Sequence, residues 1–188
     1  MIMKRIVTLS IFIILLPISL CAQDYKHEIS LSYGFMPASS IYDVLSNDFG
    51  SKPETHLGDE IMLGPLSLEY YYHLSPIWSV GVTGVYSRLE YNLYEKNAVY
   101  NKWANHATLL VGAKAHWIRG NVFKMYSKAA IGATYSIVNQ HMKVPALLPN
   151  FQLSLLGFNV MFCPQLGMFA ELGIGEQGIL HGGINLYL

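Results

Sequence analysis

Charged residues are scarce in this chain, and cysteines are nearly absent. Lysine, arginine, aspartate and glutamate make up 13% of the 188 residues, with 12 residues of each sign, whereas about a quarter is usual for globular proteins. Without an excess of basic residues the chain lacks the signature of a nucleic-acid-binding protein, so nucleic acid is excluded as a partner. Cys21 and Cys163 cannot form a disulfide framework, because the first lies in a segment that we expect to be removed.

Long apolar runs are also missing after residue 22, although 52% of the chain is hydrophobic and 13% is aromatic. No later stretch reaches the roughly 18 apolar residues that a transmembrane helix needs. Two classes of protein are this apolar without such a helix. One is a soluble lipocalin-like barrel with a large core, and the other is a barrel whose outer surface faces lipid.

The first 22 residues have the three parts of a secretory signal. Lys4 and Arg5 precede an apolar run over residues 6–20, and the small residue Ala22 follows it. The run is short for a spanning helix and is typical of a signal peptide. We therefore expect residues 1–22 to be cleaved and residues 23–188 to form one exported barrel domain.

Apolar and polar residues alternate along most of the remaining chain, as in β-strands with one apolar face. Within residues 26–35, for example, Ile29 and Leu31 alternate with Ser30 and Ser32. Eight segments are predicted strands: 26–35, 66–73, 78–90, 108–117, 126–135, 151–162, 168–175 and 180–188. Residues 151–162 are apolar at nearly every position, so their register stays open. The pattern predicts an all-β fold, an eight-stranded antiparallel up-and-down transmembrane β-barrel.

The connections between these segments alternate in length. Short turns are predicted at 74–77, 119–121 and 163–165, longer loops at 36–62, 91–105 and 138–150, and a last short connection near 176–178. Transmembrane barrels have short periplasmic turns and long outer loops in this order. We expect any extracellular ligand to bind through the three long loops.

Four charged residues inside the predicted strands lie on the polar parity, on four different strands: Glu69, Lys114, Lys128 and Glu171. Tyr71, Tyr126 and His116 share that parity. The interior of an eight-stranded barrel is filled by side chains, and buried charges need partners. We therefore expect these seven residues to form a structural polar network in the lumen. The apolar parity carries almost no charge, which favours the membrane barrel over the lipocalin-like one.

The end of the chain resembles the assembly signal of outer-membrane barrels. The polar residue His181 and then Gly183 are followed by Leu186 and Leu188 at alternate positions up to the last residue, although that signal usually ends in an aromatic residue. Residues 169–175 look like the penultimate strand of small barrels common in Bacteroidetes-type bacteria. The whole of residues 23–188 resembles this outer-membrane β-barrel class, similar to the membrane domain of OmpA and to OmpX. The resemblance implies a Gram-negative outer membrane, contacts with outer-membrane lipid and the barrel assembly machinery, and no fixed activity.

Catalytic and metal-binding motifs are lacking. Some similar barrels remove acyl chains from lipid A with a His-x-Ser pair, and the one such spacing here is His73–Leu74–Ser75. It lies on a short turn that we place on the periplasmic side, away from the lipid A leaflet, so Ser75 is interpreted as a turn residue. The seven histidines are dispersed, with no HExxH motif and no close pair, so no metal, cofactor or catalytic residue is predicted.

The sequence thus predicts a non-enzymatic outer-membrane barrel with a structural or surface-interaction role through its extracellular loops. Two alternatives stay open. One is an outer-membrane enzyme that removes or transfers an acyl chain of lipid A. The other is a soluble periplasmic lipocalin-like binding barrel.

Overall fold

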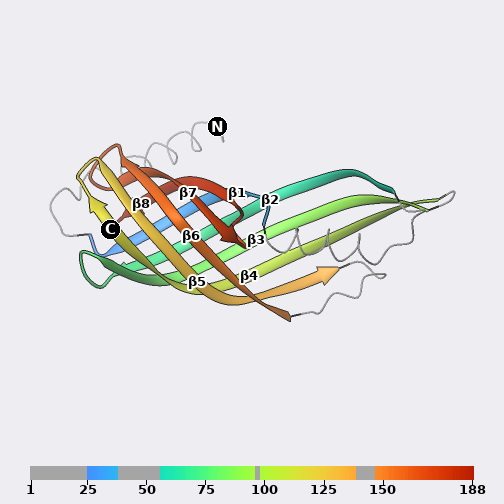
Figure 1. Cartoon of the computed structure of the whole chain (residues 1–188), viewed down its shortest axis with the longest axis horizontal. Coiled ribbons are helices and arrows are strands. Elements are labelled where there is room, and N and C mark those ends of the chain that lie inside the picture. The colour runs from blue at the N-terminus through green and yellow to red at the C-terminus, as the bar shows by residue number, and fades with distance from the viewer. Residues whose placement is uncertain (1–24, 38–55, 96–97, 139–146) are drawn as a thin grey trace, which may run out of the picture.

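The computed structural model describes residues 25–37, 56–95, 98–138 and 147–188, which form one closed β-barrel (Figure 1). Its eight strands are β1 (His27–Phe35), β2 (His56–His73), β3 (Trp78–Glu95), β4 (Ala98–Arg119), β5 (Phe123–Val138), β6 (Leu147–Met161), β7 (Leu166–Gly175) and β8 (Leu180–Tyr187). Each strand pairs antiparallel with the next, and β1 pairs antiparallel with β8. The predicted eight-stranded up-and-down barrel is therefore confirmed. The expected signal peptide lies outside the described residues and stays a prediction.

The outward face of the barrel is apolar and the inward face is polar. In β1, Ile29, Leu31 and Tyr33 are 39%, 47% and 53% exposed, whereas Glu28 and Ser30 are at most 2% exposed. The same alternation runs along the other strands, because successive side chains of a strand point to opposite faces. Within the described residues, no helix is long and apolar enough to cross a membrane.

Strand β6, whose register the sequence left open, contains a β-bulge. Its pairing with β7 shifts between Ser154 and Leu156. Before the bulge Ser154 points inward, and after it Asn159 does, so the inward parity changes from even to odd residue numbers. A bulge inserts one residue into a strand and therefore breaks strict alternation. This is the physical reason why the residue pattern of this segment could not define a register.

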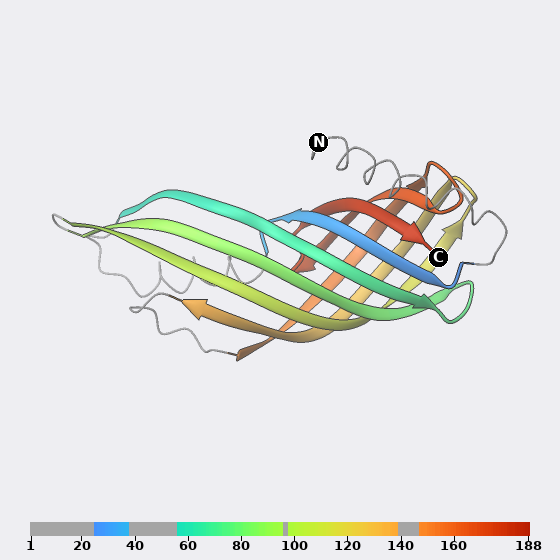
Figure 2. The ribbon, with the colours of Figure 1, turned by 180° about the vertical axis from the view of Figure 1, so that it is seen from behind.

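The short turns gather at one end of the barrel, which we call the short-turn end (Figures 1 and 2). They connect β2 to β3, β4 to β5 and β6 to β7, as predicted. The last residue also lies there, because the Leu188 amide donates to the carbonyl of His27 at 2.8 Å. The beginning of β1 and the end of β8 thus close the barrel beside the turns.

The boundaries of the three predicted long loops need correction. The predicted loop 91–105 is mostly strand, since β3 runs to Glu95 and β4 begins at Ala98. Likewise, β2 begins at His56 inside the predicted loop 36–62, and β6 begins at Leu147 inside the predicted loop 138–150. These strand ends carry no apolar parity, so the residue pattern could not reveal them. The backbone pairing that forms them tolerates almost any side chain.

Proline is accommodated in one of these extensions for a simple reason. Pro149 pairs with Ala133 of β5, but β6 pairs with β7 only from Gln152 onward. On its β7 side this part of β6 has no ladder partner in the part of the chain that the structure describes. A proline lacks the backbone N–H and is tolerated on such an unpaired strand edge.

The extended strands β2, β3 and β4 form a flap that projects beyond the rest of the barrel (Figures 1 and 2). β4 has 22 residues, against 9 in β1 and 8 in β8. At about 3.3 Å per residue, β4 is roughly 70 Å long. A strand of about ten residues is enough to cross a bilayer, so β4 is about twice as long as a membrane crossing requires. β1 pairs with β2 only up to Leu66, and β5 pairs with β4 only from Ala104. Beyond those residues, the two outer strands of the flap have no further strand partner on their outer edges among the described residues.

Candidate functional site

The centre of the lumen holds a chain of alternating buried charges. All seven residues that the sequence assigned to the lumen network have side chains inside the barrel: Glu69, Tyr71, Lys114, His116, Tyr126, Lys128 and Glu171. His116 is 6% exposed and the others are at most 2% exposed. The strand parity places them on one face, and the closure of the barrel brings them together from four strands.

Lys128 of β5 lies between two carboxylates. Its Nζ is 2.7 Å from Oε2 of Glu171 and 3.1 Å from Oε1 of Glu69. His181 of β8 completes the group, with Nε2 3.4 Å from that ammonium and 3.0 Å from Oε2 of Glu171. Tyr126 donates its hydroxyl to the other oxygen of Glu171 at 2.7 Å. A buried ammonium is stable only with such compensating contacts.

Lys114 of β4 joins this group to a third acid. Its Nζ donates to Oε1 of Glu28 at 2.8 Å and lies 3.4 Å from Oε2 of Glu69. The ammonium also lies over the ring of Tyr71, 4.2 Å from the centroid, and 5.1 Å from the ring centroid of Tyr126. Aromatic faces attract cations, so both tyrosines add to the polar environment of this charge.

Sequence reasoning missed three residues of the network. Glu28 and His181 lie on the polar parity of their strands, so the alternation could have identified them as lumen residues. Gln177 lies in the connection between β7 and β8 and donates to Oε1 of Glu69 at 2.5 Å. No strand pattern includes that position. With Glu28 added, three buried carboxylates face two buried ammonium groups in this part of the lumen, rather than the predicted two and two.

The residues of the predicted assembly signal are divided between the two faces of β8. His181 points inward to Glu171, whereas Leu188 is 42% exposed and Leu186 lies on the same outward parity. Gly183 lies against β1, where an added Cβ would come 1.9 Å from the carbonyl oxygen of Leu31. The two strands can approach this closely at Gly183 because the residue has no side chain.

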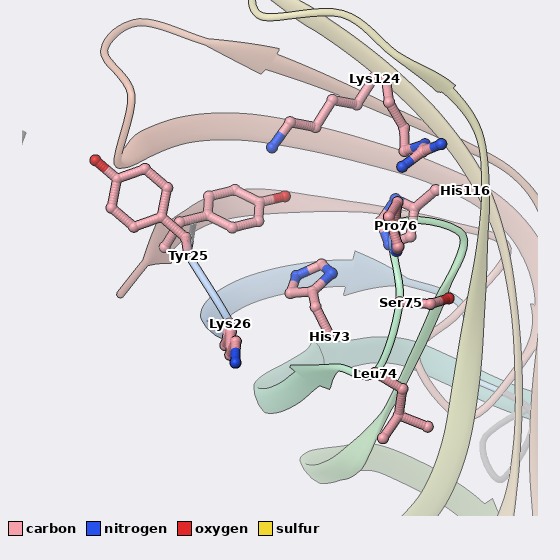
Figure 3. Close-up of a pocket in the computed structure, with 10 residues that line it drawn as sticks. Tyr25, Lys26, His73, Leu74, Ser75, Pro76, His116 and Lys124 are labelled. Carbon is pink, nitrogen blue, oxygen red and sulfur yellow. The ribbon is translucent and has the colours of Figure 1, made fainter. Parts of the chain in front are cut away.

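A pocket of about 560 Å³ opens at the short-turn end (Figure 3). Basic side chains dominate its lining: Lys26, His73, His116, Arg119 and Lys124. In Figure 3 the rings of His73 and His116 lie in the pocket wall, and Lys124 extends across from β5. The Nζ of Lys124 is 3.9 Å from the ring centroid of Tyr187, which also lines the pocket. Glu28 lies next to these histidines, with Oε2 3.3 Å from Nε2 of His73.

The His-x-Ser pair of the sequence does not form a catalytic pair. The hydroxyl of Ser75 accepts hydrogen bonds from the amides of Ile77 and Trp78, at 3.3 and 3.0 Å, as expected of a turn serine. Nδ1 of His73 instead bonds to the hydroxyl of Ser79 at 2.7 Å.

Ser79, His73 and Glu28 therefore form a serine–histidine–acid series, but its geometry opposes acyl transfer. Ser79 is fully buried, so an acyl substrate cannot reach its hydroxyl. Its Oγ also bonds to Nε2 of His116 at 3.1 Å. A nucleophile needs an approach path and an oxyanion site beside it.

Comparisons with known proteins add one structural likeness. No protein-family model matches the chain, and no curated protein matches it either. Among solved structures, the chain is similar to Ail, the attachment invasion locus protein of Yersinia pestis, solved in complex with the heparin analogue sucrose octasulfate. The identity is 11% and the TM-score is 0.39, over 86% of this chain and 95% of that one.

Proposed function

We propose that this protein is an integral outer-membrane β-barrel of a Gram-negative bacterium, with a structural and surface-interaction role and no catalysis. The observation that carries the proposal is the reversed polarity of the barrel. Large apolar side chains are exposed on every strand, for example Leu68, Leu109 and Ile184 at 59%, 63% and 52%, while the five charged residues of the ion network are buried in the lumen. Such a large exposed apolar surface is unfavourable in water but favourable in contact with lipid.

The strand lengths and the aromatic residues support the same proposal. β1, β7 and β8 have 9, 10 and 8 residues, close to the 9–11 that a tilted strand needs to cross a bilayer. Trp78 and Trp117 are exposed beside the short turns, where an interfacial aromatic girdle lies in membrane barrels. Because membrane barrels have their short turns on the periplasmic side, the short-turn end would face the periplasm and the flap would face the outside of the cell. The ion network then serves as a structural plug, and His181, Gly183, Leu186 and Leu188 serve recognition by the assembly machinery.

The flap is the part of this protein that is suited to binding an extracellular partner. Within the described residues, the flap edges formed by β2 and β4 have no strand partner beyond Leu66 and before Ala104. An unpaired strand edge can accept an extended segment of another chain by β-augmentation. An extracellular partner would therefore meet these edges together with the connections 36–55 and 139–146.

The native cysteine allows a direct test of membrane location and orientation. Cys163 is exposed in the short turn between β6 and β7. A membrane-impermeant maleimide should label it only after the outer membrane is permeabilised. As a matched control, Ile179→Cys in a Cys163→Ser background places a thiol in the opposite connection, between β7 and β8, and should be labelled in intact cells.

Two outcomes would contradict the proposal. Recovery of the protein in the soluble periplasmic fraction, without heat-modifiable gel mobility, would favour the lipocalin-like alternative. A lipid A mass profile that gains or loses an acyl chain with the gene would favour the enzyme. Surface binding is tested separately by placing a photo-crosslinking residue at 99 in the flap or at 164 in the short turn. Adducts with extracellular protein are expected at position 99 alone.

A further inference from the structure

We propose that Glu28, His73 and His116 form a binding site for one divalent transition-metal ion of the Zn²⁺ class, at the floor of the short-turn pocket. These residues come from β1, β2 and β4. Each offers one ligand atom, and the three atoms lie within 4.8 Å of one another. Two imidazoles and one carboxylate are a common ligand set for Zn²⁺ and related ions.

The contact between His73 and Glu28 has the spacing of two ligands on one ion. Nε2 of His73 lies 3.3 Å from Oε2 of Glu28. Ligands about 2.0–2.2 Å from a tetrahedral zinc ion are about 3.3–3.6 Å apart. Neither atom makes a hydrogen bond within the described part of the chain, and both are buried. When Nε2 of His73 carries no proton, both atoms are buried acceptors, and a cation between them would compensate their facing lone pairs.

Ser79 orients both imidazoles for this role. Its hydroxyl bonds to Nδ1 of His73 at 2.7 Å and to Nε2 of His116 at 3.1 Å. When His73 donates its Nδ1–H to the serine, the lone pair of its Nε2 points to Glu28. Metal-bound histidines commonly have their second ring nitrogen held by such a partner.

Lys114 fixes the carboxylate in the same way. It donates to Oε1 of Glu28 at 2.8 Å, which leaves Oε2 for the ion. The carboxylate is 2% exposed, so its orientation is determined by these contacts rather than by solvent.

A second group in the lumen shows why the site lies at the short-turn end and not deeper. Glu69, Glu171 and His181 also place three ligand atoms within 4.8 Å of one another. That group already holds a cation, because Nζ of Lys128 lies 2.7–3.4 Å from all three side chains. In the described part of the chain no lysine contacts both Glu28 and His73. The ammonium of Lys114 contacts the other carboxylate oxygen of Glu28, Oε1, at 2.8 Å.

The pocket provides access and a place for a further ligand. His73 and His116 line it, so an ion can enter from the short-turn end. Lys26, Arg119 and Lys124 line the same pocket, and their charge suits a small anion or hydroxide on the open coordination position. The site is formed by the barrel itself and does not depend on the proposed surface role.

The test is metal titration of the refolded residues 23–188 in detergent, without a polyhistidine tag and in a Cys163→Ser background. Isothermal titration with Zn²⁺ should show one ion per barrel, and Co²⁺ should give the visible d–d bands of a low-coordinate nitrogen–oxygen site. His73→Gln and His116→Gln should each weaken Zn²⁺ binding at least tenfold. Ser79→Ala, which keeps all three ligands, should weaken it about tenfold.

Matched histidine controls separate this site from adventitious binding. His27→Gln changes an exposed histidine that contacts Tyr70, and His106→Gln changes a lumen histidine bonded to Ser136. Both should bind Zn²⁺ like the parent protein, and heat-modifiable mobility verifies that each variant is folded. Absence of Zn²⁺ and Co²⁺ binding by the parent protein would overturn the proposal, as would unchanged affinity in His73→Gln and His116→Gln. In either case a hydrogen bond between Nε2 of His73 and Oε2 of Glu28 would account for their contact. If one variant does not fold, the Co²⁺ spectrum of the parent and the other histidine variant decide the question.

Discussion

Removing the central ammonium of the lumen should destabilise the barrel strongly. Lys128→Met keeps an unbranched side chain, one atom shorter, but leaves Glu69 and Glu171 without the cation that lies 3.1 and 2.7 Å from them. Breaking a buried ion pair from one side costs about 3–5 kcal/mol. This corresponds to a loss of roughly two to four powers of ten in the folding equilibrium constant.

Urea unfolding of the barrel in lipid vesicles measures this loss of unfolding free energy. Lys124→Met is the matched control, because it changes the same residue type four positions earlier on β5. Lys124 contacts the Tyr187 ring at the pocket mouth, a contact whose loss costs about 0.5–1 kcal/mol. Adding Glu171→Gln to Lys128→Met removes one of the two carboxylates that have lost this ammonium and should recover part of the stability. A Lys128→Met barrel within about 1 kcal/mol of the parent would refute the reasoning, since the carboxylates would then not depend on this ammonium.

Three further predictions follow from the packing and the proposed membrane setting. Gly157→Ala should cost about 1–3 kcal/mol of unfolding free energy, because the added Cβ would lie 2.6 Å from the ring of Tyr126, which bonds to Glu171. Gly84→Ala should be neutral in the same urea assay, because the atom nearest to its added Cβ is 3.9 Å away. Ile131→Lys, at a position 75% exposed on the outer wall, should cost about 2–4 kcal/mol in vesicles if it faces the bilayer centre, and Leu74→Lys in the short turn about 0–1 kcal/mol; equal small effects would contradict the lipid-facing wall. Replacing residues 92–101 by Asn-Gly joins the paired residues Tyr91 and Lys102 by a two-residue hairpin turn, and it should change the unfolding free energy by no more than about 1 kcal/mol, since an isolated hairpin is only marginally stable. Loss of heat-modifiable mobility in this last variant would show that the flap is needed for the barrel to fold.

The proposed metal site and the ion network differ in their access to solvent. The deep group around Lys128 is closed and carries its own cation, which supports the structural role proposed for it. The group around His73 opens to the short-turn pocket, and its third ligand, His116, comes from a different strand. One barrel thus provides a sealed polar core and, at one end, a polar site that a small ion can reach.

Residue alternation alone was sufficient to predict the fold of this protein. The two-residue period defined the apolar and polar faces of seven strands and the short turns between them, because it follows directly from backbone geometry. It also placed Glu69, Lys114, Lys128 and Glu171 on the inward face before any partner was known.

Three-dimensional closure decided which inward residues meet, because it joins strands that lie far apart in the chain. Glu28 and Lys114 are 86 positions apart and bond at 2.8 Å, and His73 and His116 have ring centroids 5.3 Å apart although the sequence shows no close histidine pair. The length of the flap and the bulge in β6 also required the structure. Both are backbone-pairing features that leave no periodic signal in the side chains, whereas the alternation reports only which face each side chain takes.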